Sequence, residues 1–143
     1  MTLTLERINA IIIMGSRSIW SRNNNVVFYE DRNGVSELFN ELPELAHKVD
    51  SNKDARIQYQ QIILYIELLK KNGIKMPSNI TKHIDDDIWE LRPGKNWVLY
   101  FYFHDNLFVL LHMFKKTTRK TPKKEIEKAK KECMDYKLRN EEK

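Results

Sequence analysis

The sequence predicts a single α+β domain whose elements follow the order β–α–α–β–β–β–α. Two stretches with apolar residues at helical spacing fill the first half of the chain, and three aromatic and β-branched runs separated by short turns follow them. The length of 143 residues suits one compact domain. Short turns imply a mostly antiparallel sheet, with the paired helices on one face and the other face available to a partner or a site.

The first two elements are a short strand and an amphipathic helix. Residues Val26–Tyr29 are β-branched and aromatic, and the turn residues Asp31–Gly34 end this strand. In the stretch Val35–Leu42, apolar residues recur at positions i, i+3, i+4 and i+7, which predicts one buried helix face. Pro43 is expected to end or kink this helix, because proline lacks the backbone N–H that a helix interior needs.

The second helix is the longest predicted element. Ser51 and Asp54 have the spacing of a capping box, which predicts a helix N-terminus at this point. Apolar residues then recur at helical spacing as far as Leu69, and two lysines followed by Gly73 are typical of a helix C-terminus.

Three strands and a last helix complete the domain. The predicted strands are Ile84–Arg92, Trp97–Phe103 and Leu107–Phe114, joined by short turns. Thr121 is the expected N-cap of the last helix, with Pro122 at its first position. This helix is covered in Lys and Glu apart from one narrow apolar stripe, which consists of Ile126, Ala129, Cys133 and Tyr136.

Residues 1–25 are predicted to lie outside the domain, which then spans residues 26–140. The segments Gly15–Ser18 and Ser21–Asn25 have the composition of loops, and chain termini are commonly mobile. We therefore expect a mobile N-terminal extension. The alternative is an arm that packs on a partner, with Trp20 as its anchor.

The charge of the chain is concentrated near its C-terminal end. The sequence has 25 Lys and Arg against 20 Asp and Glu, a formal charge of +5. Residues 115–143 hold 12 Lys and Arg and 6 Asp and Glu, whereas the preceding 114 residues hold 13 and 14. A local basic excess of this kind indicates a polyanionic partner.

Composition and motifs exclude several classes of protein. The single cysteine, Cys133, cannot form an internal disulfide, no apolar run approaches the ~20 residues of a membrane span, and no signal peptide is recognisable. These features favour a cytoplasmic protein. No glycine-rich phosphate loop, HExxH or CxxC motif is present. His104 and His112 lie on different predicted strands and have only weak spacing for metal ligands, and the run Asp85–Asp87 is more typical of a solvated turn before a strand than of a metal site. We therefore expect neither a metal nor another cofactor.

A basic stretch, Lys115–Lys124, joins the last predicted strand to the last helix. It contains six cations and three threonine hydroxyls, and no acid interrupts it before Glu125. Hydroxyl groups and a helix N-terminus both donate hydrogen bonds to phosphate, and aromatic side chains on the neighbouring sheet are able to stack on unpaired bases. A solvated charged face is the alternative interpretation. The combination of cations, hydroxyl groups, a helix N-terminus and nearby aromatic side chains favours RNA as the partner of this stretch.

Strand alternation predicts that four polar side chains meet on one face of the sheet. In the last strand, His112 and Lys116 share a face with Leu110. In the first strand of the meander, Glu90 and Arg92 share a face. If both faces are on the same side of the sheet, the four polar groups converge on one place.

Such a set suits metal-free cleavage of RNA. Glu90 or His112 would take the proton of a ribose 2′-OH or give one to the leaving 5′-oxygen, and Arg92 and Lys116 would stabilise the pentavalent phosphorane. These residues could instead have only structural roles. Glu90 and Arg92 would then form an ion pair between strands, and His112 would be a hydrogen-bonded histidine of the core.

The order of elements and three motifs resemble the phage-derived HigB-like branch of the RelE/ParE toxin superfamily over residues 26–136. The motifs are Phe28–Gly34, Ile88–Pro93 and Leu110–Pro122. The resemblance implies a RelE-like toxin of a type II toxin–antitoxin system. Such toxins cleave mRNA, typically on the ribosome and without a metal. They are silenced by a tightly bound antitoxin, often a helix-turn-helix protein, which we expect to be encoded beside the toxin.

The resemblance also implies roles for individual residues. Arg92, Lys115, Lys116 and Arg119 match positions that contact phosphate or the transition state. Lys120 and Lys123 extend the same basic surface.

One family position departs from the usual pattern. The family has an arginine early in the second strand of the meander, and this chain has Trp97 there with Lys95 nearby. Lysine lacks the bidentate guanidinium fork that suits a phosphorane, whereas Trp97 would stack on a base.

Three functions therefore remain open after the sequence alone. The first is an mRNA-cleaving endoribonuclease. The second is a non-enzymatic inhibitor of DNA gyrase of the ParE type, and the third is an RNA-binding relative with weakened catalysis.

Overall fold

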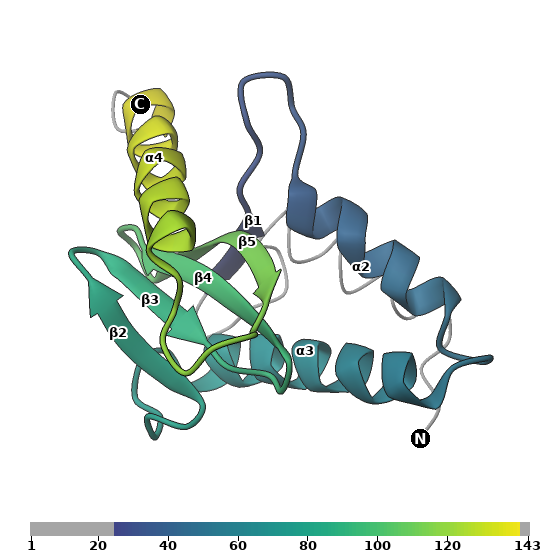
Figure 1. The fold of residues 1–143 in the computed structure, drawn as a ribbon. Helices are drawn as coiled ribbons and strands as arrows, with labels where there is room; N and C mark the ends of the chain where they lie inside the picture. Colours follow the sequence, from purple (N-terminus) through teal and green to yellow (C-terminus); the bar gives the residue numbers. More distant parts are fainter. Residues whose placement is uncertain (1–24, 141–143) are drawn as a thin grey trace.

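The computed structural model describes residues 25–140 and confirms the α+β class (Figure 1). The predicted N-terminal extension lies outside the described residues, apart from Asn25. The elements are β1 Asn25–Phe28, α2 Glu37–His47, α3 Lys53–Asn72, β2 Thr81–Asp85, β3 Ile88–Leu91, β4 Asn96–Tyr102, β5 Leu107–Lys115 and α4 Lys123–Asn140.

The strands form one five-stranded sheet in the order β1-β5-β4-β3-β2. Strands β2 to β5 make an antiparallel meander, and β1 pairs in parallel with β5 at the edge. The longest strand, β5, therefore lies between β1 and β4.

The sheet has one strand more than the sequence predicted. The predicted strand Ile84–Arg92 is wrong, because the chain reverses within it to form the β2–β3 hairpin. The turn contains Asp86 with a φ of 45° and carries no glycine, proline or asparagine. Aspartate adopts this left-handed conformation more readily than most residues. The run Asp85–Asp87 therefore forms a turn although it contains no glycine, proline or asparagine.

The first two helices differ from their predicted limits. Helix α2 continues through Pro43 to His47, with Leu42 and Ala46 buried on either side of the proline. Helix α3 is capped by Asn52, whose side-chain oxygen accepts the Ala55 N–H at 3.1 Å. The cap predicted at Ser51 is therefore one residue too early. Asparagine is an equally favourable N-cap, and here it provides the bond.

The start of the last helix also differs from the prediction. The Pro122 carbonyl accepts the first helical hydrogen bond, from the Ile126 N–H at 3.3 Å, so Thr121 precedes the cap. The Thr121 hydroxyl instead donates to Glu90. The predicted apolar stripe of α4 is confirmed, since Ala129 and Cys133 are buried against the sheet.

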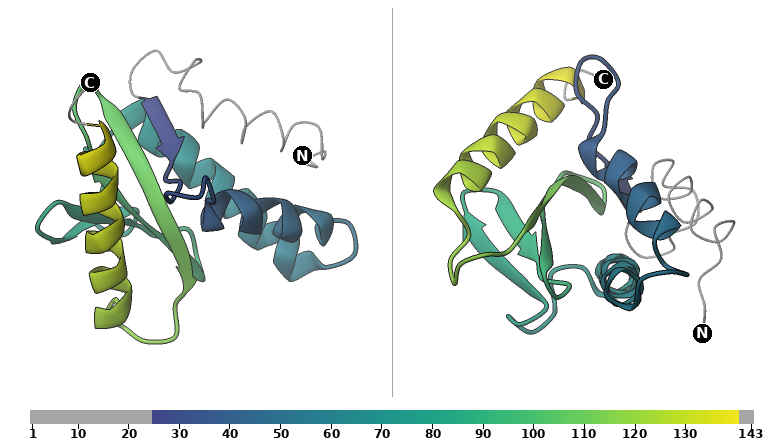
Figure 2. Two further views of the ribbon diagram at one scale, coloured as in Figure 1. Left: turned by 90° about the horizontal axis from the view of Figure 1, so that it is seen from above. Right: turned by 45° about the vertical axis from the view of Figure 1, so that its right-hand side comes forward.

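Helices cover both faces of the sheet (Figure 2). Helices α2 and α3 pack on one face and form a core around Leu38, Leu42 and Tyr59. Helix α4 packs on the other face and forms a second core around Leu99, Phe101 and Ala129. The expectation that the second face is open is therefore wrong, because the narrow stripe of α4 closes much of it.

A β-bulge in β5 decides which way His112 points. Leu99 pairs with His112 and the next residue, Tyr100, pairs with Leu110, so Leu111 is the extra residue. Leu110 consequently joins the α2–α3 core, whereas Leu111 joins the core beneath α4. Leu110 and His112 do not share a face, as simple alternation predicted. The bulge turns His112 toward α4.

Candidate functional site

Four predicted residues meet where β3 ends, β4 begins and β5 leads into the basic stretch. The Arg92 guanidinium carbon and the Lys116 ammonium nitrogen each lie 4.6 Å from the centre of the Trp97 ring. Glu90 accepts a hydrogen bond of 2.8 Å from the Arg92 Nε. The sheet thus brings Glu90, Arg92, Trp97 and Lys116 into one cluster, which we call the Trp97 cluster.

Trp97 supports the two cations. Its side chain is buried, with 6% exposure, and its Nε1–H donates to the Gly94 carbonyl at 3.0 Å. An aromatic ring attracts cations to its face, by about 0.5–1 kcal/mol where the site is exposed and by more where water is excluded. In the described structure, Arg92 and Lys116 lie close to the ring that the sequence assigned to base stacking.

Glu90 is fully buried and both of its oxygens are engaged. Oε1 accepts from Arg92, and Oε2 accepts from the Thr121 hydroxyl. One carboxylate therefore holds the guanidinium and ties the basic stretch to the sheet. The ion pair between Glu90 and Arg92, which the sequence left as an alternative, is present in the structure.

His112 lies on the same face but outside the Trp97 cluster. Glu90 and His112 both pair with Leu99, one from β3 and one from β5, which separates them by two strand spacings, or about 10 Å. Its Nδ1 lies 2.5 Å from Glu132 and its Nε2 lies 3.1 Å from Glu125, and the ring is 1% exposed. The four predicted catalytic residues therefore form two groups.

The surroundings of His112 hold both of its ring nitrogens. Glu132 lies at hydrogen-bond distance from Nδ1 and Glu125 from Nε2. The three side chains form a triad that connects β5 to α4. Either Glu90 or His112 must break one of these bonds before it can transfer a proton to a substrate.

The remaining predicted contacts lie on exposed segments. Lys95 pairs with Asp54 at 3.3 Å, and both side chains are more than half exposed. The backbone N–H of Lys116 donates to the Lys95 carbonyl at 2.7 Å, which fixes the start of the basic stretch. The other cations are exposed around the same loop, namely Lys115, Arg119, Lys120 and Lys123.

The turn between β3 and β4 is held against α3. Asn96 donates from Nδ2 to the Gln58 Oε1 at 2.6 Å. Gly94 has a φ of 75°, and a Cβ at this position would collide with the Gln61 side chain. The positive φ favours glycine at this position, whereas the flexible end of Gln61 could move away from an added Cβ. The bond from Asn96 to Gln58 attaches the start of β4, next to Lys95 and Trp97, to α3.

Sequence reasoning missed Thr121, Glu125 and Glu132 as members of the site. Thr121 has the appearance of a helix cap, and its contact with Glu90 spans 31 positions. Glu125 and Glu132 are seven positions apart on α4, a spacing that places both on one face of a helix. That spacing was a readable signal, but only the β5 bulge shows that His112 faces it.

No metal-binding cluster of three His, Cys, Asp or Glu side chains occurs within residues 25–140. In the same part of the chain, none of the helices is sufficiently long and apolar to cross a membrane.

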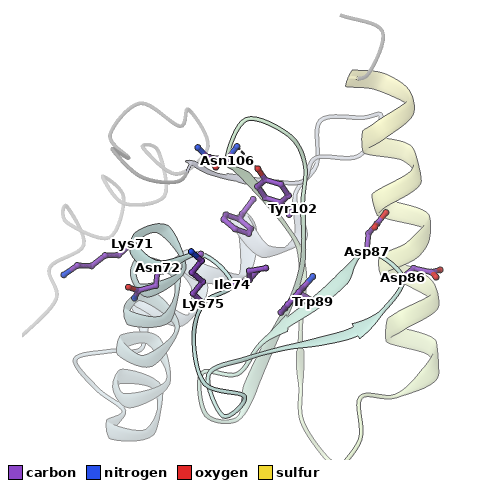
Figure 3. Close-up of a pocket in the computed structure, with 11 residues that line it drawn as sticks. Lys71, Asn72, Ile74, Lys75, Asp86, Asp87, Trp89, Tyr102 and Asn106 are labelled. Carbon is purple, nitrogen blue, oxygen red and sulfur yellow. Dashed lines mark hydrogen bonds between the residues drawn. The ribbon is translucent and has the colours of Figure 1, made fainter.

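A pocket of about 710 Å³ lies at the opposite end of the strands (Figure 3). Its walls come from the end of α3, the β2–β3 turn and the β4–β5 turn, and include Trp89, Tyr102 and Asn106. None of the predicted site residues lines it.

Comparison with known protein families gives a match over most of the described domain. The family model described as "Phage derived protein Gp49-like (DUF891)" matches residues 42–133, which is more than half of the chain. No curated protein matches the sequence. The matched region contains every predicted site residue, the Thr121 anchor and both carboxylates that hold His112.

Proposed function

Because the chain belongs to the phage-derived Gp49-like family, a family of toxins from toxin–antitoxin systems related to RelE- and HigB-type toxins, we propose that it is an mRNA-cleaving endoribonuclease of the HigB-like branch. The family implies an antitoxin as partner. The proposed antitoxin is a helix-turn-helix protein encoded beside the toxin. The proposed substrate is mRNA on the ribosome, which places the reaction in the cytoplasm.

One observation carries the proposal: Arg92 and Lys116 are held together over Trp97 at the start of an exposed basic loop. The loop cations are free to contact the phosphates of RNA, and the two clustered cations are placed to stabilise one phosphate as it gains charge. Arg92 needs no further organisation, since Glu90 holds its Nε and the Ser78 carbonyl accepts from its Nη1 at 3.2 Å. Preorganised cations of this kind suit attack by a ribose 2′-OH on the adjacent phosphate.

We assign the proton transfer to His112 rather than to Glu90. Both side chains are buried, but the two oxygens of Glu90 hold Arg92 and Thr121, which the basic loop needs in place. His112 is bound on its Nε2 side by Glu125, which is partly exposed in the first turn of α4 and makes the longer of the two bonds. Release of Glu125 frees Nε2 while Glu132 still orients the ring.

The test is cleavage of cellular transcripts. Expression of the wild-type chain should arrest growth and produce new transcript 3′-ends, and an Arg92→Ala/Lys116→Ala variant should lose both effects. The matched control is Lys71→Ala/Lys75→Ala, which removes the same charge from exposed positions near the opposite end of the strands. Cleavage that persists in the Arg92/Lys116 variant would contradict the site.

Two other outcomes select the alternative functions. Growth arrest with intact transcripts and an induced DNA-damage response would indicate inhibition of gyrase. RNA binding that weakens steeply with salt but gives no cleavage products would indicate a binding relative in which Lys95 and Trp97 do not replace the family arginine.

A further inference from the structure

The outer surface of α4 carries an exposed stripe that the domain itself does not use. Its residues follow one another at alternating spacings of three and four, which places them on one side of a helix. They are Lys124, Glu127, Lys131, Met134 and Leu138, and all five are exposed. Helix α4 is the outermost layer on its side of the described fold (Figure 2).

The stripe is apolar in its second half. Met134 is 60% exposed and Leu138 is 61% exposed, more than any other large apolar side chain in the described part of the chain. Hollows of about 380 and 260 Å³ lie on the two sides of Met134. Neighbouring exposed apolar side chains beside hollows are typical of surfaces that bind another protein.

Three of the four acids of α4 are engaged by side chains of the domain and do not lie on the stripe. Glu125 and Glu132 contact His112, and Asp135 accepts from the Tyr29 hydroxyl at 2.7 Å. Of the acids on α4, only Glu127 lies on the outer stripe. The acids beside the apolar half are paired with cations, namely Asp86 with Lys130, Asp87 with Lys137 and Asp135 with Arg32. Lys124 and Lys131 form no ion pair within residues 25–140, so they give the stripe a net positive charge against the single Glu127.

We propose that the outer stripe of α4 is the docking surface for an acidic amphipathic helix of the antitoxin. Apolar residues of that helix would cover Met134 and Leu138, and its Asp and Glu side chains would face Lys124 and Lys131. The inference rests on membership of a toxin–antitoxin family and not on cleavage of RNA.

The position of the stripe explains how such a partner would silence the toxin. Helix α4 begins directly after the basic loop, so the Lys124 end of the stripe lies beside Lys123 and the loop cations (Figure 1). An acidic helix that follows the stripe reaches this loop at one end. Its carboxylates then occupy the cations that the proposed substrate needs.

The experiment measures binding of the full chain to the purified product of the neighbouring gene. Met134→Glu/Leu138→Glu should weaken binding about 100-fold, because each change removes an apolar contact and adds a charge that repels an acidic helix. The matched control is Ile57→Glu/Leu64→Glu, which changes two exposed apolar residues on α3, on the other side of the sheet. It should bind within about twofold of wild type.

A charge variant supplies a second, independent measurement. Lys124→Glu/Lys131→Glu should lower the association rate at least tenfold at low salt, with the difference shrinking as salt is added. Equal affinities of wild type and the Met134/Leu138 variant would overturn the inference, as would failure of the wild-type chain to bind the neighbouring gene product.

Two further results separate this inference from other assignments. Self-association of the wild-type chain that is lost in the Met134/Leu138 variant would assign the stripe to a second copy of the chain and overturn the inference. A chain that binds the antitoxin through the stripe but cleaves no RNA would support the docking surface and contradict only the proposed ribonuclease activity.

Discussion

At the level of single residues, Glu90 is more important for what it holds than for its own chemistry. Its type and position were predicted, but the sequence assigned it to proton transfer. The structure surrounds it with Arg92 on one oxygen and Thr121 on the other. A carboxylate satisfied on both sides keeps two other groups in place, so we infer that Glu90 is a positioning residue.

Removal of the Thr121 hydroxyl tests this role. Thr121→Val leaves one oxygen of a buried carboxylate without its donor, which should lower the free energy of unfolding by about 1–3 kcal/mol. The basic loop should also lose its attachment to the sheet, so binding of single-stranded RNA should weaken. Urea denaturation and fluorescence anisotropy measure the two effects.

Thr121→Ser is the matched control, because it keeps the hydroxyl and removes only a methyl group. It should retain most of both the stability and the binding. Equal stability of Thr121→Val and wild type would show that the bond to Glu90 contributes nothing.

At the level of secondary-structure elements, α4 is fastened to the loop that follows β1. Asp135 accepts hydrogen bonds from Arg139 at 2.7 Å, from Tyr29 at 2.7 Å and from Arg32 at 3.2 Å. Arg139 also donates to the Glu30 carbonyl. The hydrogen bonds from Arg139 and Tyr29 lower the pKa of Asp135 from its ordinary value of 3.8 to about 2.

The lowered pKa predicts how acid affects the packing of α4. A carboxylate whose pKa is depressed in the folded state stabilises the fold above its unfolded pKa, and this contribution disappears as the pH falls from about 4 to about 2. The free energy of unfolding should therefore fall over this range in the wild type. Asp135→Asn should be less stable at pH 6 and show a shallower fall below pH 4. Parallel pH profiles for the two proteins would contradict the prediction.

The elements also show where sequence patterns stop being informative. The sequence predicted α3 because its apolar spacing is produced by packing on one core, and it predicted β4 and β5 because their consecutive apolar residues are buried on both faces of the sheet. It missed β2, because the reversal at Asp86 has no glycine or proline to mark it. It also missed the bulge at Leu111. An extra residue in a strand changes which face of the sheet the neighbouring side chains lie on, but it leaves no mark in the composition. The split between His112 and the Trp97 cluster follows from the two strand spacings that separate β3 from β5.

At the level of the whole molecule, most negative side chains of α4 are engaged within the domain, and the positive side chains of the basic loop lie on its surface. Acids on α4 are used inside the domain, whereas the cations of the basic loop remain exposed. The concentration of charge in the last fifth of the chain was visible in the sequence. The inward direction of the acids was not, because it depends on what α4 covers.

This distribution predicts the salt dependence of RNA binding. Each phosphate contact to a single strand contributes about 0.7 to the slope of log K against log salt, so Lys115→Ala/Arg119→Ala/Lys120→Ala should reduce the slope by about 2. A titration of single-stranded RNA at several salt concentrations measures it. The control Lys48→Ala/Lys71→Ala/Lys75→Ala removes three exposed cations at or just beyond the C-terminal ends of α2 and α3 and should leave the slope nearly unchanged. Equal slopes for both triple variants would place the RNA elsewhere.

The parallel pairing of β1 with β5 has a consequence for the synthesis of the chain. Asn25 lies opposite Leu107, so β1 cannot pair with β5 until most of the described chain has been translated. Contacts between such distant segments form late in folding and slow it. Lys116, Thr121 and α4 emerge later still. A protein proposed to act on translating mRNA would therefore assemble its site only after these segments have been translated, which delays its action on the ribosome that makes it.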